Sequence, residues 1–151
     1  MKIKPSLLLA LLSLTIAGGL LAAPPAKRVS ISGFDTMKYS VSTIEASPGQ
    51  SIIIELKNEG SLPKDAMGHN WILLKAGTDA AAYDKAASLA KAEDYQPKAL
   101  AGQVLASIRL LGPKERAVTS FNAPTAPGSY TYLCTFPAHF AAGMKGTVVV
   151  K

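Results

Sequence analysis

Three residues near the carboxyl end of the chain carry side chains that bind metal ions. Cys134, His139 and Met144 are five residues apart each time. They offer a thiolate, an imidazole and a thioether, which are soft or borderline donors that suit copper. The segment that holds them is expected to form one loop between two strands, so the other elements must be arranged around this loop.

A trigonal copper site takes two imidazoles and a thiolate, with a weak axial Met. The second histidine of the chain is His69, in the segment Met67-Gly68-His69-Asn70-Trp71. Taken singly, a Cys is most often a small buried hydrophobe, and a His is more often a structural or surface residue. Because the one Cys and both His lie in two short segments that a sandwich fold can bring together, a shared metal site is the favoured interpretation.

The first 23 residues have the pattern of an export signal. Lys2 and Lys4 precede an apolar run from Leu7 to Leu21. The alternative is a membrane anchor, but the run is short for a bilayer crossing, which takes about 20 apolar residues. We therefore expect a signal peptide at 1–23 that directs export, and a single domain at 24–151 with no membrane span.

Charge and cysteine content exclude some classes of function. Loss of Lys2 and Lys4 would lower the formal net charge from +6 to about +4, and the remaining basic residues are scattered among acidic ones. Nucleic acid is therefore not an expected partner. A single Cys cannot form an internal disulfide, so a free thiol in an exported protein points to another use, such as metal binding.

The pattern along the chain is mostly that of strands. Alternating or β-branched residues predict strands at 29–33, 39–43, 51–56, 71–74, 117–121, 129–134 and 147–150. Thr78 can cap an Ala-rich helix over 79–91 that docks on a sheet, and 103–111 is ambiguous. The predicted fold is all-β, an antiparallel Greek-key β-sandwich or barrel with a helical insertion.

Five segments of the chain are similar to those of the cupredoxin family, in its azurin-like branch. They are 33–39 with Met37, Leu62-Pro63-Lys64, 67–71, Cys134-Thr135-Phe136-Pro137 and Met144-Lys145-Gly146-Thr147. The resemblance spans nearly all of residues 24–151. It implies a periplasmic blue (type 1) copper protein that carries single electrons between larger redox proteins.

The resemblance also implies roles for individual residues. By position, His69, Cys134 and His139 resemble the equatorial copper ligands, Met144 the axial ligand, and the Gly68 carbonyl a weak fifth contact. Asn70 is expected to tie the two ligand segments together, and the Phe136 amide to donate to the sulfur.

The implied partners are redox proteins, such as c-type cytochromes or periplasmic oxidoreductases. They are expected to dock on a monomer near His139, Phe140, Met37 and Met67, with the His139 ring edge near solvent. Core packing is the alternative role for Phe140, and the residues leave this choice open.

Three features depart from the azurin pattern. Four residues separate His139 from Met144, which resembles the spacing in auracyanins. Lys27 and Gln50 stand where azurins place a disulfide, and Ala138 stands where a Gly is usual before the second ligand His. The longer spacing makes Met144 and the Gly68 carbonyl less certain ligands than the other three residues.

Two other functions compete with electron transfer. A copper carrier or buffer would favour an open site rich in Met and His, and the chain has a surplus of neither. A copper enzyme of this fold needs further His ligands, and both His of the chain are already used. We therefore expect an electron carrier and not an enzyme.

Overall fold

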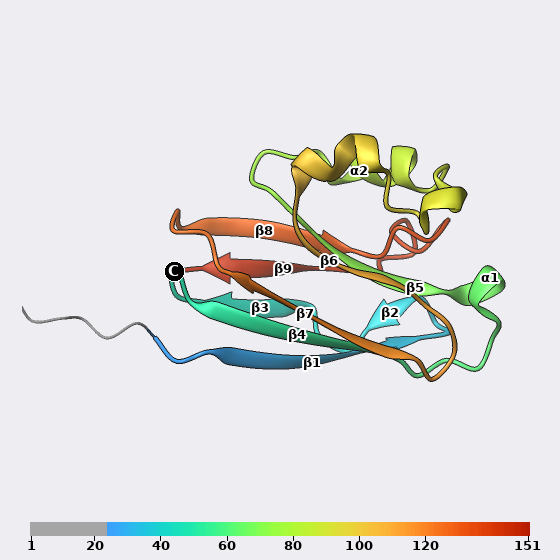
Figure 1. Ribbon diagram of the computed structural model, residues 1–151, viewed down its shortest axis with the longest axis horizontal. Coiled ribbons are helices and arrows are strands. Elements are labelled where there is room, and N and C mark those ends of the chain that lie inside the picture. Colours follow the sequence, from blue (N-terminus) through green and yellow to red (C-terminus); the bar gives the residue numbers. More distant parts are fainter. Residues whose placement is uncertain (1–23) are drawn as a thin grey trace, which may run out of the picture.

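Two β-sheets pack face to face in the computed structural model, which describes residues 24–151 (Figure 1). The first sheet has the strand order β2-β1-β4-β7, and the second has the order β3-β9-β8-β5-β6. The strands of the first sheet are β1 (Lys27–Phe34), β2 (Lys38–Tyr39), β4 (Ser51–Asn58) and β7 (Arg116–Asn122). Those of the second are β3 (Thr43–Ala46), β5 (His69–Leu74), β6 (Val104–Leu111), β8 (Gly128–Leu133) and β9 (Lys145–Val150). The predicted export signal lies outside the described residues.

The predicted sandwich is confirmed, as two separate sheets and not a closed barrel. The strands are not all antiparallel, because β1 pairs with β4 and β3 pairs with β9 in parallel. Between β1 and β4 the chain visits the other sheet as β3, and this detour lets it return in the same direction. The ambiguous segment 103–111 contains β6, which pairs with β5.

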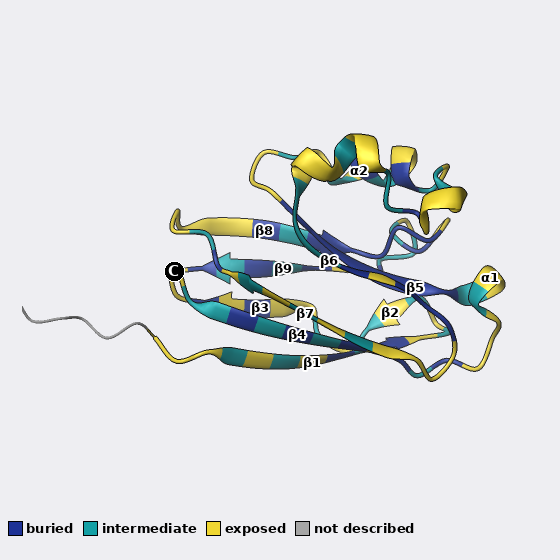
Figure 2. Ribbon diagram, viewed as in Figure 1, coloured by how far each residue is buried: buried dark blue, intermediate teal, exposed yellow. Residues whose placement is uncertain are grey.

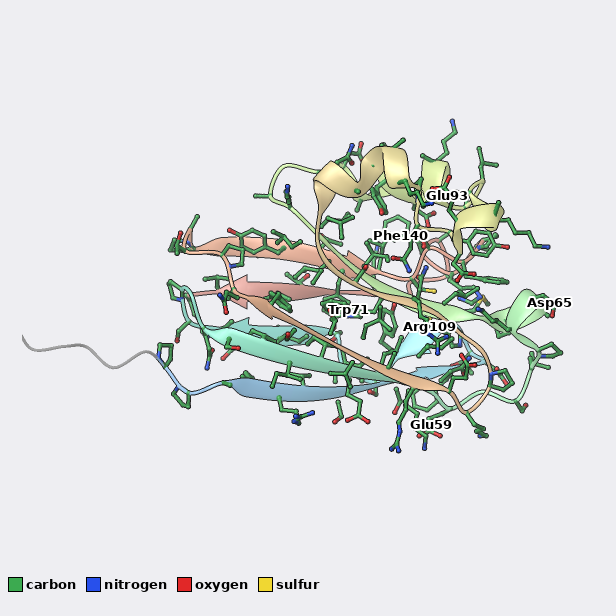
Figure 3. The ribbon with its side chains drawn as sticks, in the orientation of Figure 1. Glu59, Asp65, Trp71, Glu93, Arg109 and Phe140 are labelled. Atoms are coloured by element: carbon green, nitrogen blue, oxygen red, sulfur yellow. The ribbon has the colours of Figure 1, made fainter. Side chains whose placement is uncertain are left out.

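The core lies between the sheets and is built from alternate strand residues. On β4, Ile52, Ile54 and Leu56 are fully buried, whereas the intervening Ile53 and Glu55 are partly exposed on the outer face. The apolar, β-branched run Ile52 to Ile54 predicts burial on both faces, but only one face of this strand is fully covered. Instead β5 is the strand with every residue buried, and Trp71 on it lies between the two sheets (Figures 2 and 3).

The helical insertion explains why β5 is covered on both faces. It contains α2 (Ala80–Ala87) and the short 3₁₀-helices Lys91–Glu93 and Lys98–Gln103, and it lies over the outer face of the second sheet (Figure 1). Tyr83 and Ala87 of α2 pack against Ile72 and Leu74 of β5 and Leu133 of β8. A separate short helix, α1 (Lys64–Met67), precedes β5.

The predicted helix is present, but its cap and its end differ from our expectation. Asp79, not Thr78, is the N-cap, and its carboxylate accepts hydrogen bonds from the amides of Ala81 and Ala82. The Asp79 carboxylate thus satisfies two free amides of the first turn. The Thr78 hydroxyl, one residue earlier, is not the cap of this helix. The α-helix ends at Ala87, with Ser88 as its C-cap, and does not continue to Lys91.

The amino-terminal strand is held without a disulfide. Gln50 Nε2 donates to the carbonyl of Pro25 at 2.9 Å, and Lys27 Nζ donates to the carbonyl of Glu45 at 2.7 Å. Lys27 and Gln50, which stand where azurins place a disulfide, thus attach this part of the chain to neighbouring segments by hydrogen bonds. Among residues 24–151, none of the helices has the length and apolar character that crossing a bilayer requires.

Replacing the helix cap tests the corrected helix start. Asp79→Ala should lower the free energy of unfolding by about 1 kcal/mol, because two amides of the first turn lose their acceptor. Thr78→Ala is the matched control and should change stability by less than about 0.5 kcal/mol. Urea unfolding followed by circular dichroism measures both variants, and an equal loss in the two would contradict the Asp79 cap.

Candidate metal centre

Adjacent strands of the second sheet bring the two candidate segments together at one end of the sandwich. His69 is the first residue of β5, Cys134 directly follows β8, and Met144 directly precedes β9. Strand β8 pairs with both β5 and β9. The three strands therefore deliver these residues to the same end of the sheet, on the α1 side and away from the carboxyl terminus (Figure 1).

Backbone hydrogen bonds close the segment between Cys134 and Met144 into a compact loop. The Cys134 amide donates to the Met144 carbonyl at 3.1 Å, and the Met144 amide donates to the His139 carbonyl at 2.9 Å. The His139 amide in turn donates to the Phe136 carbonyl at 3.0 Å. These bonds, all within residues 134–144, fix the backbone of the loop that carries the predicted donors.

The predicted sulfur and nitrogen donors converge. Within residues 24–151, His69, Cys134 and His139 form a group whose ligand atoms all lie within 4.8 Å of one another. The Nδ1 atom of His139 lies 3.3 Å from Nδ1 of His69 and 3.4 Å from Sγ of Cys134. Metal bonds of about 2.0 Å to nitrogen and 2.3 Å to sulfur would put trigonal donors about 3.5 Å apart. The arrangement therefore fits one metal ion bound by two imidazoles and a thiolate.

Met144 and Gly68 lie beside this group. The Met144 side chain is fully buried in the same cluster as Cys134 and Phe136. A methyl carbon built on Gly33 of β1 would lie 3.1 Å from Cε of Met144 and 2.9 Å from Cδ2 of His69. Gly33 thus leaves room for both side chains. Gly68 is buried and directly precedes His69.

Burial sets the protonation of the donors. It raises the pKa of the Cys134 thiol to about 12, although the backbone amides of Asn70 and Phe136 act in the opposite direction. Burial and the neighbouring His69 lower the pKa of His139 to about 4, and burial also lowers the pKa of His69. At neutral pH the imidazoles are therefore uncharged and able to bind a metal, whereas the thiol must first lose its proton.

A buried side-chain clamp joins the two candidate segments, as expected for Asn70. Its Oδ1 accepts from the Thr135 amide at 2.9 Å, and its Nδ2 donates to the Thr135 hydroxyl at 2.7 Å. The Thr135 hydroxyl donates onward to the Tyr95 carbonyl at 2.7 Å. Asn70 therefore positions His69 and Cys134 relative to each other through the residues that follow them in sequence.

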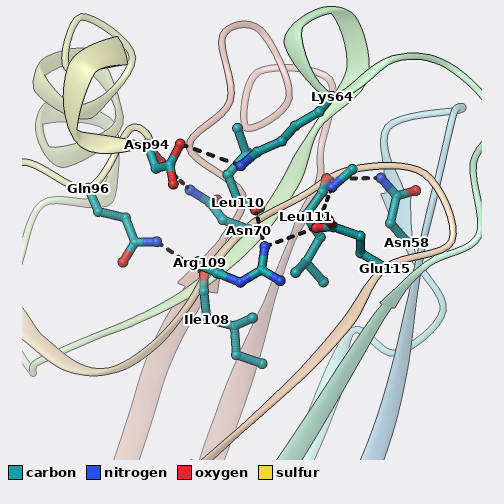
Figure 4. A network of polar contacts seen from close by, with 11 residues as sticks. Asn58, Lys64, Asn70, Asp94, Gln96, Ile108, Arg109, Leu110, Leu111 and Glu115 are labelled. Carbon is teal, nitrogen blue, oxygen red and sulfur yellow. Dashed lines mark hydrogen bonds and ion pairs between the residues drawn. The ribbon is translucent and has the colours of Figure 1, made fainter.

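The hydrogen bonds of this clamp extend into the helical insertion, which the sequence did not predict to be connected with the site. Asn70 Nδ2 also reaches the Asp94 carbonyl at 3.4 Å, and Lys64 Nζ lies 3.7 Å from the Asp94 carboxylate (Figure 4). Asp94 and Tyr95 have positive φ angles of 52° and 59°, an uncommon conformation for residues other than glycine. No local pattern marks this pair, since its partners lie far away in sequence.

The immediate surroundings of His139 are apolar, but the ring itself is more buried than predicted. The residue is 1% exposed, and its ring centroid lies 4.7 Å from that of Phe136. Phe140 is partly buried against the cluster that includes Tyr83 and Leu133, and it lies between the helical insertion and the sheet (Figure 3). Lys145 Nζ lies 4.6 Å from its ring centroid. Of the two roles left open for Phe140, the structure favours packing.

Removing the clamp should destabilise the protein even without metal. Asn70→Leu would leave the buried Thr135 amide without its acceptor, which should lower the free energy of unfolding by about 1–3 kcal/mol. Asn122→Leu, on the exposed face of β7, is the control and should change stability by less than about 0.5 kcal/mol. Denaturant unfolding of the metal-free proteins measures the difference, and equal stabilities would rule out the clamp.

Comparison with known proteins agrees with the geometry. The chain is 38% identical to azurin of Bordetella pertussis over 123 residues, covering 80% of this chain and 81% of that protein. It is 31% identical to auracyanin-B of Chloroflexus aurantiacus over 128 residues, covering 83% of this chain and 53% of that protein. The crystal structure of reduced auracyanin from Roseiflexus castenholzii superposes with a TM-score of 0.74 at 32% identity, covering 86% and 99% of the two chains.

Residues 26–151 also match the family described as copper binding proteins, plastocyanin/azurin family. This match includes every residue of the buried donor group and both sheets of the sandwich. Two neutral imidazoles, a cysteine sulfur and a nearby thioether are the donors that copper takes in such sites. The chain therefore belongs to the plastocyanin/azurin family of copper binding proteins, and copper is its cofactor.

Proposed function

We propose that this protein is a blue (type 1) copper protein that carries single electrons between redox proteins. In this proposal His69, Cys134 and His139 would hold the copper ion, with Met144 as a weaker sulfur ligand and the Gly68 carbonyl as a weak further contact. The observation that carries the proposal is the convergence of the two Nδ1 atoms and the sulfur at 3.3–3.4 Å around His139.

The chain contributes rigidity and exclusion of water. Bound copper supplies the one-electron couple, whose two states prefer different geometries. The donors are buried and tied by the Asn70 clamp and the loop hydrogen bonds. Such a frame holds the same donor positions in both oxidation states, so little rearrangement accompanies electron transfer.

The backbone near the sulfur adjusts the electronic properties of the site. The amides of Asn70 and Phe136 favour the thiolate form of Cys134. Hydrogen bonds to a ligand and a dry surrounding shell tune the potential of a metal site. We therefore expect these two amides to contribute to the potential at which this protein exchanges electrons.

A docking face for redox partners surrounds the site. Apolar residues at this end of the molecule include the exposed Phe34 and Leu62, the partly exposed Met37 and Met67, and the exposed Pro137, Ala138 and Ala141. We call these residues the apolar face. Small apolar interfaces suit redox partners that must separate quickly. Phe140 packs inward against the cluster that includes Tyr83 and Leu133, so it contributes little to the apolar face.

The site favours a relay over the competing functions. A copper buffer needs donors that exchange the ion readily, whereas the sulfur and both imidazoles are at most 1% exposed. Both histidines of the chain lie in the same donor group, which leaves none for a separate catalytic copper. We also propose that residues 1–23 direct export to the periplasm, where the mature protein acts as a monomer.

The spectrum of the copper-loaded protein tests the proposed site. We expect a strong thiolate-to-copper charge-transfer band and a narrow copper hyperfine splitting in electron paramagnetic resonance. Cys134→Ser should abolish the band, because the serine hydroxyl is not a thiolate donor. A colourless or square-planar copper spectrum in the wild-type protein would refute the proposal.

Charging the apolar face tests where partners dock. Leu62→Lys should slow electron self-exchange by about tenfold, because two copies would then meet with like charges and less apolar contact. Val118→Lys is the matched control, since Val118 is 56% exposed on the outer face of β7. Stopped-flow or magnetic resonance measures both rates, with the copper spectrum as a check. An equal effect of the two substitutions would place docking elsewhere.

A further inference from the structure

Strand β2 contacts the loop between Cys134 and Met144, which carries the proposed ligands. Lys38, at the start of β2, donates a hydrogen bond from Nζ to the carbonyl of Ala142, which is 104 residues away in sequence. Ala142 lies in the four-residue segment between His139 and Met144, the segment whose length departs from the azurin pattern. The contact thus joins a distant strand to this part of the site.

The segment around Ala142 depends on a specific backbone shape. Gly143 has a φ of +96°, and a methyl carbon built on it would lie 2.7 Å from Lys38 Nζ. The amides of Gly143 and Met144 donate to the carbonyls of Phe140 and His139, each at 2.9 Å. The left-handed backbone favours glycine at this position, and the missing side chain also leaves room for the ammonium group of Lys38.

The same strand pair approaches the proposed ligands directly. Gly33, in β1, allows the close approach of Met144 and His69, and it pairs with Tyr39, the residue after Lys38. In the same loop, the Phe140 ring packs against the cluster that includes Tyr83 of the helical insertion, and Lys145 Nζ lies over the ring. The loop is therefore held at two positions that are two residues apart: at Phe140 by packing, and at Ala142 by the hydrogen bond from Lys38.

We propose that Lys38 is a positioning residue that fixes the Ala142–Met144 backbone and thereby the place of the Met144 sulfur relative to the metal. The anchoring of the loop is a property of the chain itself and exists without copper. Its effect on the axial sulfur rests on the proposed ligand role of Met144.

Hydrogen exchange in the metal-free protein tests the anchoring. Lys38→Met removes the donor but keeps a similar apolar stem, and the amides of Gly143 and Met144 should then exchange about three- to tenfold faster. Lys38→Arg keeps a cationic donor and should stay within about twofold of the wild type. Lys27→Met is the matched control, since Lys27 also donates to a backbone carbonyl, that of Glu45. Unchanged exchange in Lys38→Met would overturn the anchoring.

The copper-loaded variants test the consequence for the axial sulfur. Lys38→Met should change the relative intensities of the charge-transfer bands and speed copper loss to a chelator by about three- to tenfold, whereas Lys38→Arg and Lys27→Met should match the wild type. Faster loop exchange with wild-type spectra would overturn the link to Met144. If the wild-type protein itself shows no blue copper spectrum, the proposed function fails, while the metal-free exchange result still decides the anchoring.

Discussion

The central constraint on this protein is that a thiol and two imidazoles must lie close together in a dry interior. Burial raises the pKa of the Cys134 thiol to about 12 and lowers that of His139 to about 4, so without metal the group is held in its uncharged form. Polar groups of this kind are costly to bury unless they have partners. The surrounding structure must therefore supply enough packing and hydrogen bonding to keep them together.

Strand β5 provides much of this packing, because it is buried along its whole length. The sheet-to-sheet core covers one face through Trp71, and the helical insertion covers the other through Tyr83 and Ala87. The insertion also supplies the carbonyl of Tyr95 to the Thr135 hydroxyl that Asn70 engages. It is thus part of the metal site as well as a cover for the sheet.

The carboxyl-terminal loop shows how a departure from the family pattern is accommodated. Ala138, where azurins usually have Gly, adopts a φ of 71°, and Gly143 takes the left-handed shape later in the same loop. Bonds from the loop's own amides, the Phe140 anchor and the Lys38 contact together hold a segment with four residues between His139 and Met144. His139 remains 1% exposed behind apolar neighbours, which permits close approach of a partner without opening the site to water.

The amino-acid sequence was enough to predict the converging sulfur and nitrogen donors and the β-sandwich, because Cys134 and His139 are near neighbours in the chain and strand patterns are local. His69 followed as the one other histidine of the chain, and the family resemblance supplied the role of Asn70. The folded structure was needed to establish the parallel strand pairs, the Asp79 cap in place of Thr78, the packing of Phe140 and the contacts of Tyr95 and Lys38. Each of these, apart from the choice between adjacent caps, depends on groups that are distant in sequence, and such pairings leave no periodic or compositional trace in the segments that make them.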